Sequence, residues 1–130
     1  MTDSARSRIL IIDDNRDHLE ILRTTLSPKY EVVTATDGLE GYAWACCHLP
    51  DAILLDIMMP VIDGYTVWRK LRANPVTQTI PIVLVTALDP ESVEPSVMGD
   101  GLTTILRKPC HAGEVLDSLN AVLDLPDPAG

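Results

Sequence analysis

The residues of this chain that could carry chemistry are polar side chains that directly follow short apolar runs. They comprise three acids, one hydroxyl and one amine, namely Asp13, Asp14, Asp56, Thr86 and Lys108. Carboxylate oxygens are the ligands that Mg²⁺ prefers in proteins, and charged donors bind phosphoryl oxygens strongly. If the fold brings these side chains together, they would form a site for a divalent cation beside a phosphoryl group.

The elements that must position these residues alternate regularly. Short apolar runs, which predict β-strands, occupy residues 8–12, 30–35, 52–56, 81–85 and 103–107. Amphipathic segments, which predict helices, follow each run: one after Asp14-Asn15, one from Asp37 to about Pro50, one over 65–73, one over about 90–98 and one that carries Val115 to Leu123. This alternation predicts an α/β fold, a doubly wound five-stranded parallel sheet of flavodoxin-like order 2-1-3-4-5 with helices on both faces.

Such a sheet would bring the three acids to one edge, because parallel strands all end on the same side and open α/β sheets bind ligands there. At a separation of ~4 Å, each pair of unit charges costs roughly 1–4 kcal/mol at effective dielectric constants of 80 down to 20. Three clustered acids and an incoming phosphoryl group would therefore repel one another strongly. We expect Mg²⁺ and the ammonium of Lys108 to offset that charge.

The segment over residues 90–98 is the weakest of the predicted helices. Asp89 is a suitable N-cap and Pro90 suits the first turn. Pro95, however, lacks an N–H, and inside a helix it costs about 3 kcal/mol or more. Few apolar residues can anchor the segment, so we expect a short or kinked helix there.

Composition bounds the class of protein. A chain of 130 residues with 46% hydrophobic residues is one domain with a substantial core. Its net charge of −9 disfavours direct binding to nucleic acid, which requires a basic surface. No apolar run reaches the ~20 residues that span a membrane, and the first eight residues lack the apolar run of a signal peptide. We therefore expect a cytoplasmic protein without a membrane partner.

The cysteines and histidines give no sign of a further site. The spacing of the cysteines fits neither a disulfide framework nor a zinc site, so we expect reduced thiols at Cys46, Cys47 and Cys110. The histidines show no ligand spacing, and we expect surface or cap positions for His18, His48 and His111.

Over about residues 7–124 the chain resembles the response-regulator receiver domains of the CheY-like superfamily. The resemblance depends on short motifs that fall at the predicted strand and helix ends: Asp13-Asp14, Asp37-Gly38, Pro50-Asp51, Leu54-Leu55-Asp56-Ile57-Met58-Met59-Pro60, Asp63-Gly64, Ile80-Pro81, Thr86-Ala87 and Lys108-Pro109. Each motif is common alone, but their combined order is specific. Residues 49–89 further resemble receivers linked to diguanylate cyclases or found in hybrid histidine kinases.

The resemblance implies a phosphoacceptor domain of a two-component signalling system. Asp56 would be the phosphoacceptor, with Thr86, Ala87 and Lys108 binding the phosphoryl group. The domain would be no enzyme beyond assisting its own phosphorylation and dephosphorylation.

The resemblance also implies Mg²⁺ as the cofactor. Its ligands would come from Asp13, Asp14 and Asp56, together with the backbone carbonyl of Met58. We expect Asp14 to bind the ion directly and Asp13 to bind it through water.

The implied partners follow from this class of domain. A histidine kinase or a histidine phosphotransfer protein would donate the phosphoryl group from a phosphohistidine. Output would pass through an effector domain C-terminal to residue 130 or through a homodimer. We expect the receiver domain over residues 8–124, an N-terminal extension at 1–7, and a Pro-containing tail or truncated linker at 125–130. Many receivers carry an aromatic ring where this chain has Ile105. That ring changes orientation when the signal is passed on, so we expect this chain to pass its signal on in another way.

Three other functions fit part of the pattern. A haloacid-dehalogenase-like phosphohydrolase also uses a strand-end Asp, but it requires a second acid where this chain has Met58. A flavodoxin requires a Ser/Thr/Gly-rich phosphate loop after the first strand, where residues 13–16 read Asp-Asp-Asn-Arg. A degenerate receiver that only binds partners would lack Asp56 or Lys108, and both are present.

Overall fold

The computed structural model of the chain describes residues 6–59, 62–87, 93, 95–108 and 110–123. Within them lies a five-stranded parallel sheet in the order β2-β1-β3-β4-β5, formed by β1 (Arg8–Ile12), β2 (Glu31–Ala35), β3 (Ala52–Asp56), β4 (Ile82–Thr86) and β5 (Thr103–Arg107). The helices are α1 (Arg16–Leu26), α2 (Gly38–His48), α3 (Gly64–Ala73), α4 (Pro95–Met98) and α5 (Ala112–Leu123). The predicted doubly wound sheet is confirmed.

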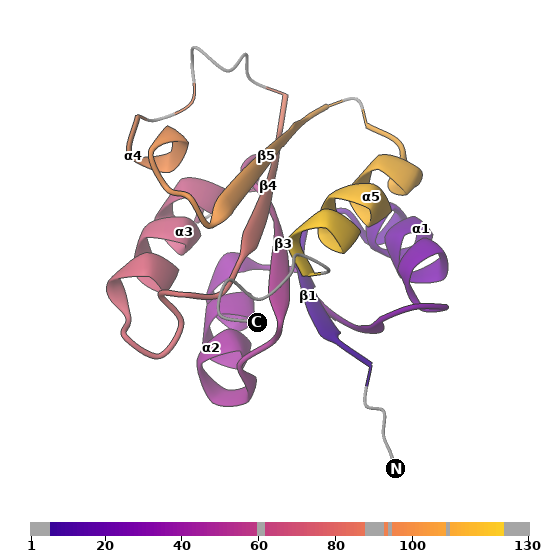
Figure 1. The fold of residues 1–130 in the computed structure, drawn as a ribbon, viewed down its shortest axis with the longest axis horizontal. Helices are drawn as coiled ribbons and strands as arrows, with labels where there is room; N and C mark the ends of the chain where they lie inside the picture. Colours follow the sequence, from indigo (N-terminus) through magenta and orange to yellow (C-terminus); the bar gives the residue numbers. More distant parts are fainter. Residues whose placement is uncertain (1–5, 60–61, 88–92, 94, 109, 124–130) are drawn as a thin grey trace.

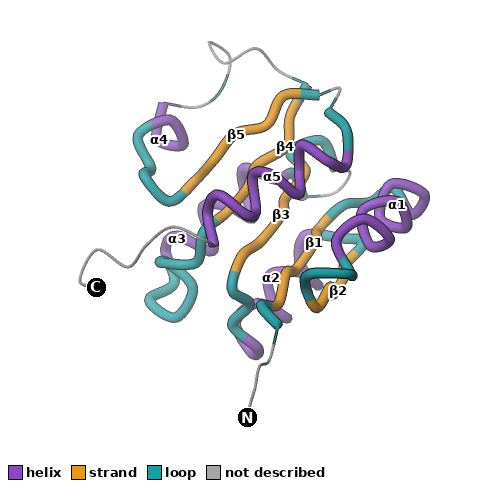
Figure 2. Tube along the Cα trace, turned by 45° about the vertical axis from the view of Figure 1, so that its right-hand side comes forward, coloured by secondary structure: helices purple, strands orange, loops and turns teal. Residues whose placement is uncertain are grey.

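Helices cover both faces of the sheet, with α1 and α5 on one face and α2, α3 and α4 on the other (Figure 1). Figure 2 shows β5 at the edge next to α4 and β2 at the opposite edge. Residues of β1 alternate between the two layers, because Ile9 and Ile11 pack toward α1 and α5 while Leu10 and Ile12 pack toward α2 and α3. All residues of β3 and β4 are buried, as expected of central parallel strands.

The caps explain where the first three helices begin. Asn15, Asp37 and Asp63 each precede a helix in an extended conformation, and each side chain accepts a hydrogen bond from the backbone N–H three residues later. The predicted boundaries agree with the structure within one residue for all five strands and for α3. No helix in the described ranges is both long and apolar enough to cross a membrane.

The helix expected over about 90–98 is short, as predicted, but it covers only the last part of that range. We expected a helix over about 90–98 that Pro95 would interrupt, whereas α4 covers only Pro95–Met98 and begins at that proline. Pro suits the first position of a helix, since the N–H that it lacks would have no partner there. Asp89 and Pro90, the expected start, lie outside the described residues. Val93 and Val97 are buried in the core beneath this segment.

A partly buried polar network fixes the start of β5 against α3. The Arg72 guanidinium lies 2.6 Å from the Asp100 carboxylate, and the Thr103 hydroxyl donates to the same carboxylate at 2.6 Å. Trp68 in turn donates its indole N–H to the Thr103 oxygen at 2.9 Å. Burial alone would raise the pKa of Asp100, but these hydrogen bonds outweigh it and hold that pKa below its ordinary value. The network thus anchors the strand whose far end leads to Lys108.

The loop after β3 folds back on the strand end because Gly64 has no side chain. A Cβ at this position would lie 2.5 Å from the backbone oxygen of Asp56 and 2.6 Å from the Cα of Ile57. The Gly64 N–H instead donates to the Ile57 carbonyl at 2.9 Å. This close approach holds the start of α3 directly against the residue that ends β3.

Replacing Gly64 with Ala should lower the free energy of unfolding by about 1–3 kcal/mol, because backbone atoms must move to admit the methyl group. Gly113 in α5 is a matched control, since a Cβ there would meet nothing within 4 Å. Gly113→Ala should be neutral or stabilise by roughly 0.5–1 kcal/mol, because Ala favours a helix over Gly. Urea denaturation of the two variants measures both values. Equal stability of the variants would contradict the close approach at Gly64.

Candidate functional site

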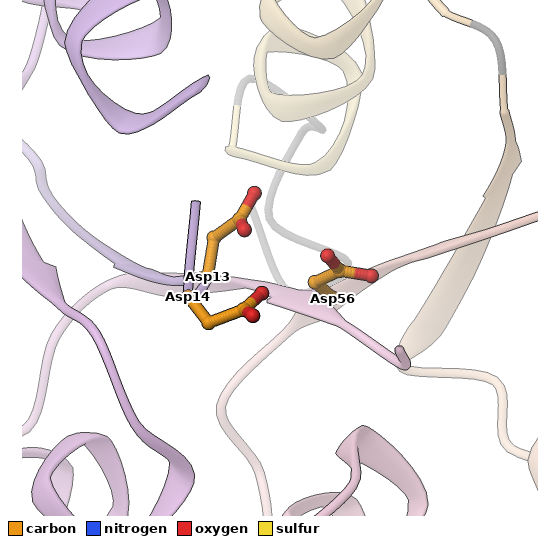
Figure 3. Close-up of side chains that lie close together, drawn as sticks. All are labelled: Asp13, Asp14 and Asp56. Atoms are coloured by element: carbon orange, nitrogen blue, oxygen red, sulfur yellow. The ribbon is translucent and has the colours of Figure 1, made fainter. Parts of the chain in front are cut away.

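Three carboxylates meet at the carboxyl ends of two adjacent strands. Asp13 and Asp14 follow β1, and Asp56 is the last residue of β3, which pairs with β1 (Figure 3). One oxygen from each carboxylate can be chosen so that all three lie within 4.8 Å of one another. The Asp13 N–H still donates to the Ala35 carbonyl of β2 at 3.1 Å, so the sheet ladder itself fixes the position of this acid. The structure therefore brings together the three acids that the sequence singled out.

Asp56 is a buried carboxylate with a donor at each oxygen. Its side chain is 6% exposed, and Lys108 Nζ donates to Oδ2 at 3.1 Å. The backbone N–H of Met58 donates to Oδ1, also at 3.1 Å. Burial raises the pKa of Asp56 above its ordinary value, and the donors Lys108 and Met58 offset that effect only in part. The nearby charge of Asp13 raises the pKa further.

Lys108 is held by its backbone as well as by its charge. Its N–H donates to the Thr86 carbonyl at 2.7 Å, so the residue after β5 is bound to the end of β4. Thr86 is fully buried, one position beyond Val85, which pairs with Asp56. Ala87 and Lys108 line an open hollow of about 410 Å³, together with His18 and Cys110. The amine of Lys108 and the hollow thus lie beside the acids, and Thr86 ends the neighbouring strand.

Of the remaining residues that the sequence assigned to the site or its motifs, the structure describes Met58 but not the two prolines. Met58 has an exposed side chain, and its backbone N–H is directed at Asp56. Pro60 and Pro109, which belong to the motifs quoted above, lie outside the described residues.

The donor set fits a small, hard cation. Asp13 and Asp56 are buried, whereas Asp14 is exposed, so Asp14 presents its carboxylate toward solvent at the rim of the cluster. Mg²⁺ takes oxygen ligands and keeps several waters, so one buried face of carboxylates and one open face suit it. Asp13, Asp14 and Asp56 are accordingly the residues that could hold such an ion.

His18 is a site residue that the sequence reasoning missed. It was expected at the surface or at a cap, yet its Nδ1 lies in hydrogen-bonding contact with Asp13 Oδ2. The other oxygen of Asp13 accepts from the Asn15 N–H at 2.9 Å. The cap at Asn15 was the available signal, because side chains in the first turn of a helix point back toward its N-terminus and thus toward the preceding strand end.

Comparison with known proteins defines the family. The sequence model of the response regulator receiver domain matches residues 9–120. The chain therefore belongs to the response regulator receiver domain family, whose members are signalling domains of two-component systems. Nothing in the comparisons supports a haloacid-dehalogenase-like phosphohydrolase.

Two curated relatives illustrate the range of the family. Response regulator PleD of Caulobacter vibrioides is 45% identical over 104 residues, which cover 79% of this chain and 23% of PleD. The DNA-binding dual master transcriptional regulator RpaA of Synechocystis is 37% identical over 123 residues, which cover 92% of this chain and 50% of RpaA. The chain thus spans half or less of the length of these relatives.

Solved structures agree with the fold. Chemotaxis protein CheY4 of Vibrio cholerae is 31% identical with a TM-score of 0.82, and the match covers 92% of this chain and 100% of that chain. The receiver domain of a Pseudomonas aeruginosa sensor histidine kinase is 29% identical with a TM-score of 0.77 over 93% of this chain and 100% of its own. That structure has a magnesium ion coordinated in its active site cleft.

The raised pKa of Asp56 predicts how stability depends on pH in metal-free buffer. Because the pKa of Asp56 in the folded chain lies above its ordinary value of 3.8, folding favours the neutral carboxyl group. Its stabilising contribution is complete below that value and is lost as the pH rises through the folded pKa. Asp56→Asn, which removes the titration, should therefore gain stability relative to the parent as the pH rises above 3.8. Urea denaturation in EDTA measures the difference, and a parent that gains on the variant as the pH rises would refute the assignment.

Proposed function

We propose that this receiver domain takes a phosphoryl group from a phosphohistidine onto Asp56. The observation that carries the proposal is the buried Asp56 carboxylate, 3.1 Å from Lys108 Nζ and clustered with two further acids. A carboxylate is an accepted covalent nucleophile, and a lysine beside it offsets charge on a transferring phosphoryl group. The family assignment supports the same chemistry.

The transfer is a single exchange of bonds at phosphorus. An Asp56 oxygen forms the new O–P bond while the N–P bond of the donor breaks, and the departing imidazole keeps the electron pair of that bond. Lys108 stabilises the negative charge of the phosphoryl oxygens, since its ammonium already lies against the carboxylate. Thr86 and the backbone N–H of Ala87 bind the other phosphoryl oxygens from the end of β4.

We further propose that Asp13, Asp14 and Asp56 hold Mg²⁺, with the Met58 carbonyl as a fourth protein ligand. When bound, the ion supplies positive charge between the acids and the phosphoryl oxygens. Asp14, the exposed acid of the cluster, is the proposed direct ligand. One oxygen of Asp13 accepts a hydrogen bond from the Asn15 N–H, and the other contacts His18. Because both oxygens already have partners, we propose that Asp13 binds the ion through a water molecule.

The wider assignments are proposals as well. The receiver would occupy residues 8–124, between an extension at 1–7 and a tail or linker at 125–130. It would work in the cytoplasm, without catalysing reactions of other molecules, with a histidine kinase or histidine phosphotransfer protein as its donor. An effector domain beyond residue 130 or a homodimer would provide the output. The net charge of −9 supports the absence of direct nucleic-acid binding by this segment, whatever longer relatives such as RpaA bind.

Phosphorylation itself is the first test. Incubation with acetyl phosphate and Mg²⁺ should add one phosphoryl mass to the intact protein, and Asp56→Ala should abolish the addition. Lys108→Met should still fold but accept the group far more slowly, because the charge that stabilises the transferring group is gone. Intact-mass spectrometry over time measures all three proteins. Equal labelling of the Asp56→Ala variant would show that another residue is the acceptor.

Metal binding can be tested without phosphorylation. An ion that binds only the folded chain raises its stability by about 1.4 kcal/mol when present at roughly ten times its dissociation constant. Mg²⁺ should therefore raise the melting temperature of the native protein, and Asp14→Asn should remove most of that increase. EDTA-treated samples without Mg²⁺ give the baseline. Asp17→Asn, which removes an acid in the first turn of α1, is the matched control. An undiminished increase in Asp14→Asn would exclude Asp14 as a ligand.

A further inference from the structure

His18 is joined to the acidic cluster by its side chain. It lies in the first turn of α1, and its Nδ1 contacts Asp13 Oδ2. The His18 side chain is 31% exposed, whereas that of Asp13 is 4% exposed, so the ring covers a buried acid at the mouth of the site. The same ring lines the 410 Å³ hollow beside Lys108.

The side chain of His18 is not needed for the helix. The cap of α1 uses the backbone N–H of His18, which donates to the Asn15 side chain at 3.0 Å. The imidazole makes its own contact with Asp13, on the preceding strand end. Side chains point toward the N-terminus of their helix, which explains how a residue of the first turn reaches back to that acid. The ring is therefore free of the helix cap and makes its contact with the acid.

The chemistry of the pair fixes the direction of the hydrogen bond. An ionised carboxylate can only accept, so the hydrogen lies on Nδ1 of His18. Asp13 Oδ1 accepts from the Asn15 N–H at 2.9 Å, so both carboxylate oxygens have a donor. Each oxygen retains a second lone pair for a cation or for a water bound to it. The orientation of Asp13 is thus set before any ion arrives.

We propose that His18 is a positioning residue of the cation site: its Nδ1–H holds the Asp13 carboxylate in the orientation that a divalent cation requires. The inference rests on the proposed function, because it assumes that the three acids bind an ion. Partners that orient metal-binding groups typically change metal affinity by about 10–100-fold. His18 is partly exposed, so we expect a loss near the lower end, roughly tenfold.

Two substitutions separate the hydrogen bond from the bulk of the ring. His18→Leu fills similar space without a donor, whereas His18→Asn places an amide N–H near the position of Nδ1. His48→Leu, on the exposed end of α2, controls for the loss of a histidine elsewhere. Melting temperatures in EDTA check that each variant is folded, because His18→Leu also leaves a buried carboxylate oxygen without its donor.

Mn²⁺ serves as the probe, with the free ion measured by electron paramagnetic resonance and Mg²⁺ affinity obtained by competition. We expect His18→Leu to bind roughly tenfold more weakly than the native protein, and His18→Asn and His48→Leu to bind within about twofold of it. Native affinity in His18→Leu, or an equal loss in His18→Asn, would overturn the positioning role. Failure of the native protein to bind the ion at the acids, with Asp14→Asn unchanged, would overturn the proposed site itself.

Nitrogen-15 NMR of the imidazole gives an independent readout. The signal of the His18 Nδ1 should be that of a nitrogen that carries hydrogen, and this signature should disappear on replacing Asp13 with Ala. A neutral ring with its hydrogen only on Nε2 in the native protein would contradict the proposed donor.

Discussion

Repulsion among the carboxylates of Asp13, Asp14 and Asp56 is the constraint on which the rest of this site depends. Two of these acids are almost fully buried, so their charges repel each other where water screens them little. The sheet can hold them because β1 and β3 lie side by side in a core whose strands are buried on both faces. Core packing therefore keeps the three carboxylates together although their charges repel one another. A cation that binds among them is strongly favoured as a result.

The ammonium that lies against Asp56 comes from Lys108, which follows β5, two strands away from β3 in the sheet. The network of Arg72, Asp100 and Thr103 fixes the start of β5, and the backbone of Lys108 is bound to the end of β4. Neither the network at the start of β5 nor the backbone hydrogen bond of Lys108 uses the ammonium of that lysine. The lysine is thus placed by the fold, and its charge is available for Asp56 and for a group bound there.

The sequence predicted the sheet and the acids because both follow from local patterns. Short apolar runs, helix caps such as Asn15 and motifs at strand ends can each be recognised from a few neighbouring residues. The contact of His18 with Asp13 and the close approach of Gly64 to the end of β3 depend on how elements meet in space. The start of α4 was misplaced because Pro95 fits either the break or the first turn of a helix, and only packing decides between them.

The central claim is that Asp56, within this arrangement, is where a phosphoryl group binds. Beryllofluoride mimics that group without a transfer step, so its binding to the isotope-labelled chain can be followed by NMR in the presence of Mg²⁺. The account predicts saturable shifts of the backbone signals of Asp56, Thr86, Ala87 and Lys108, and no such shifts in Asp56→Asn. Identical shifts in that variant, or none in the native protein, would contradict it.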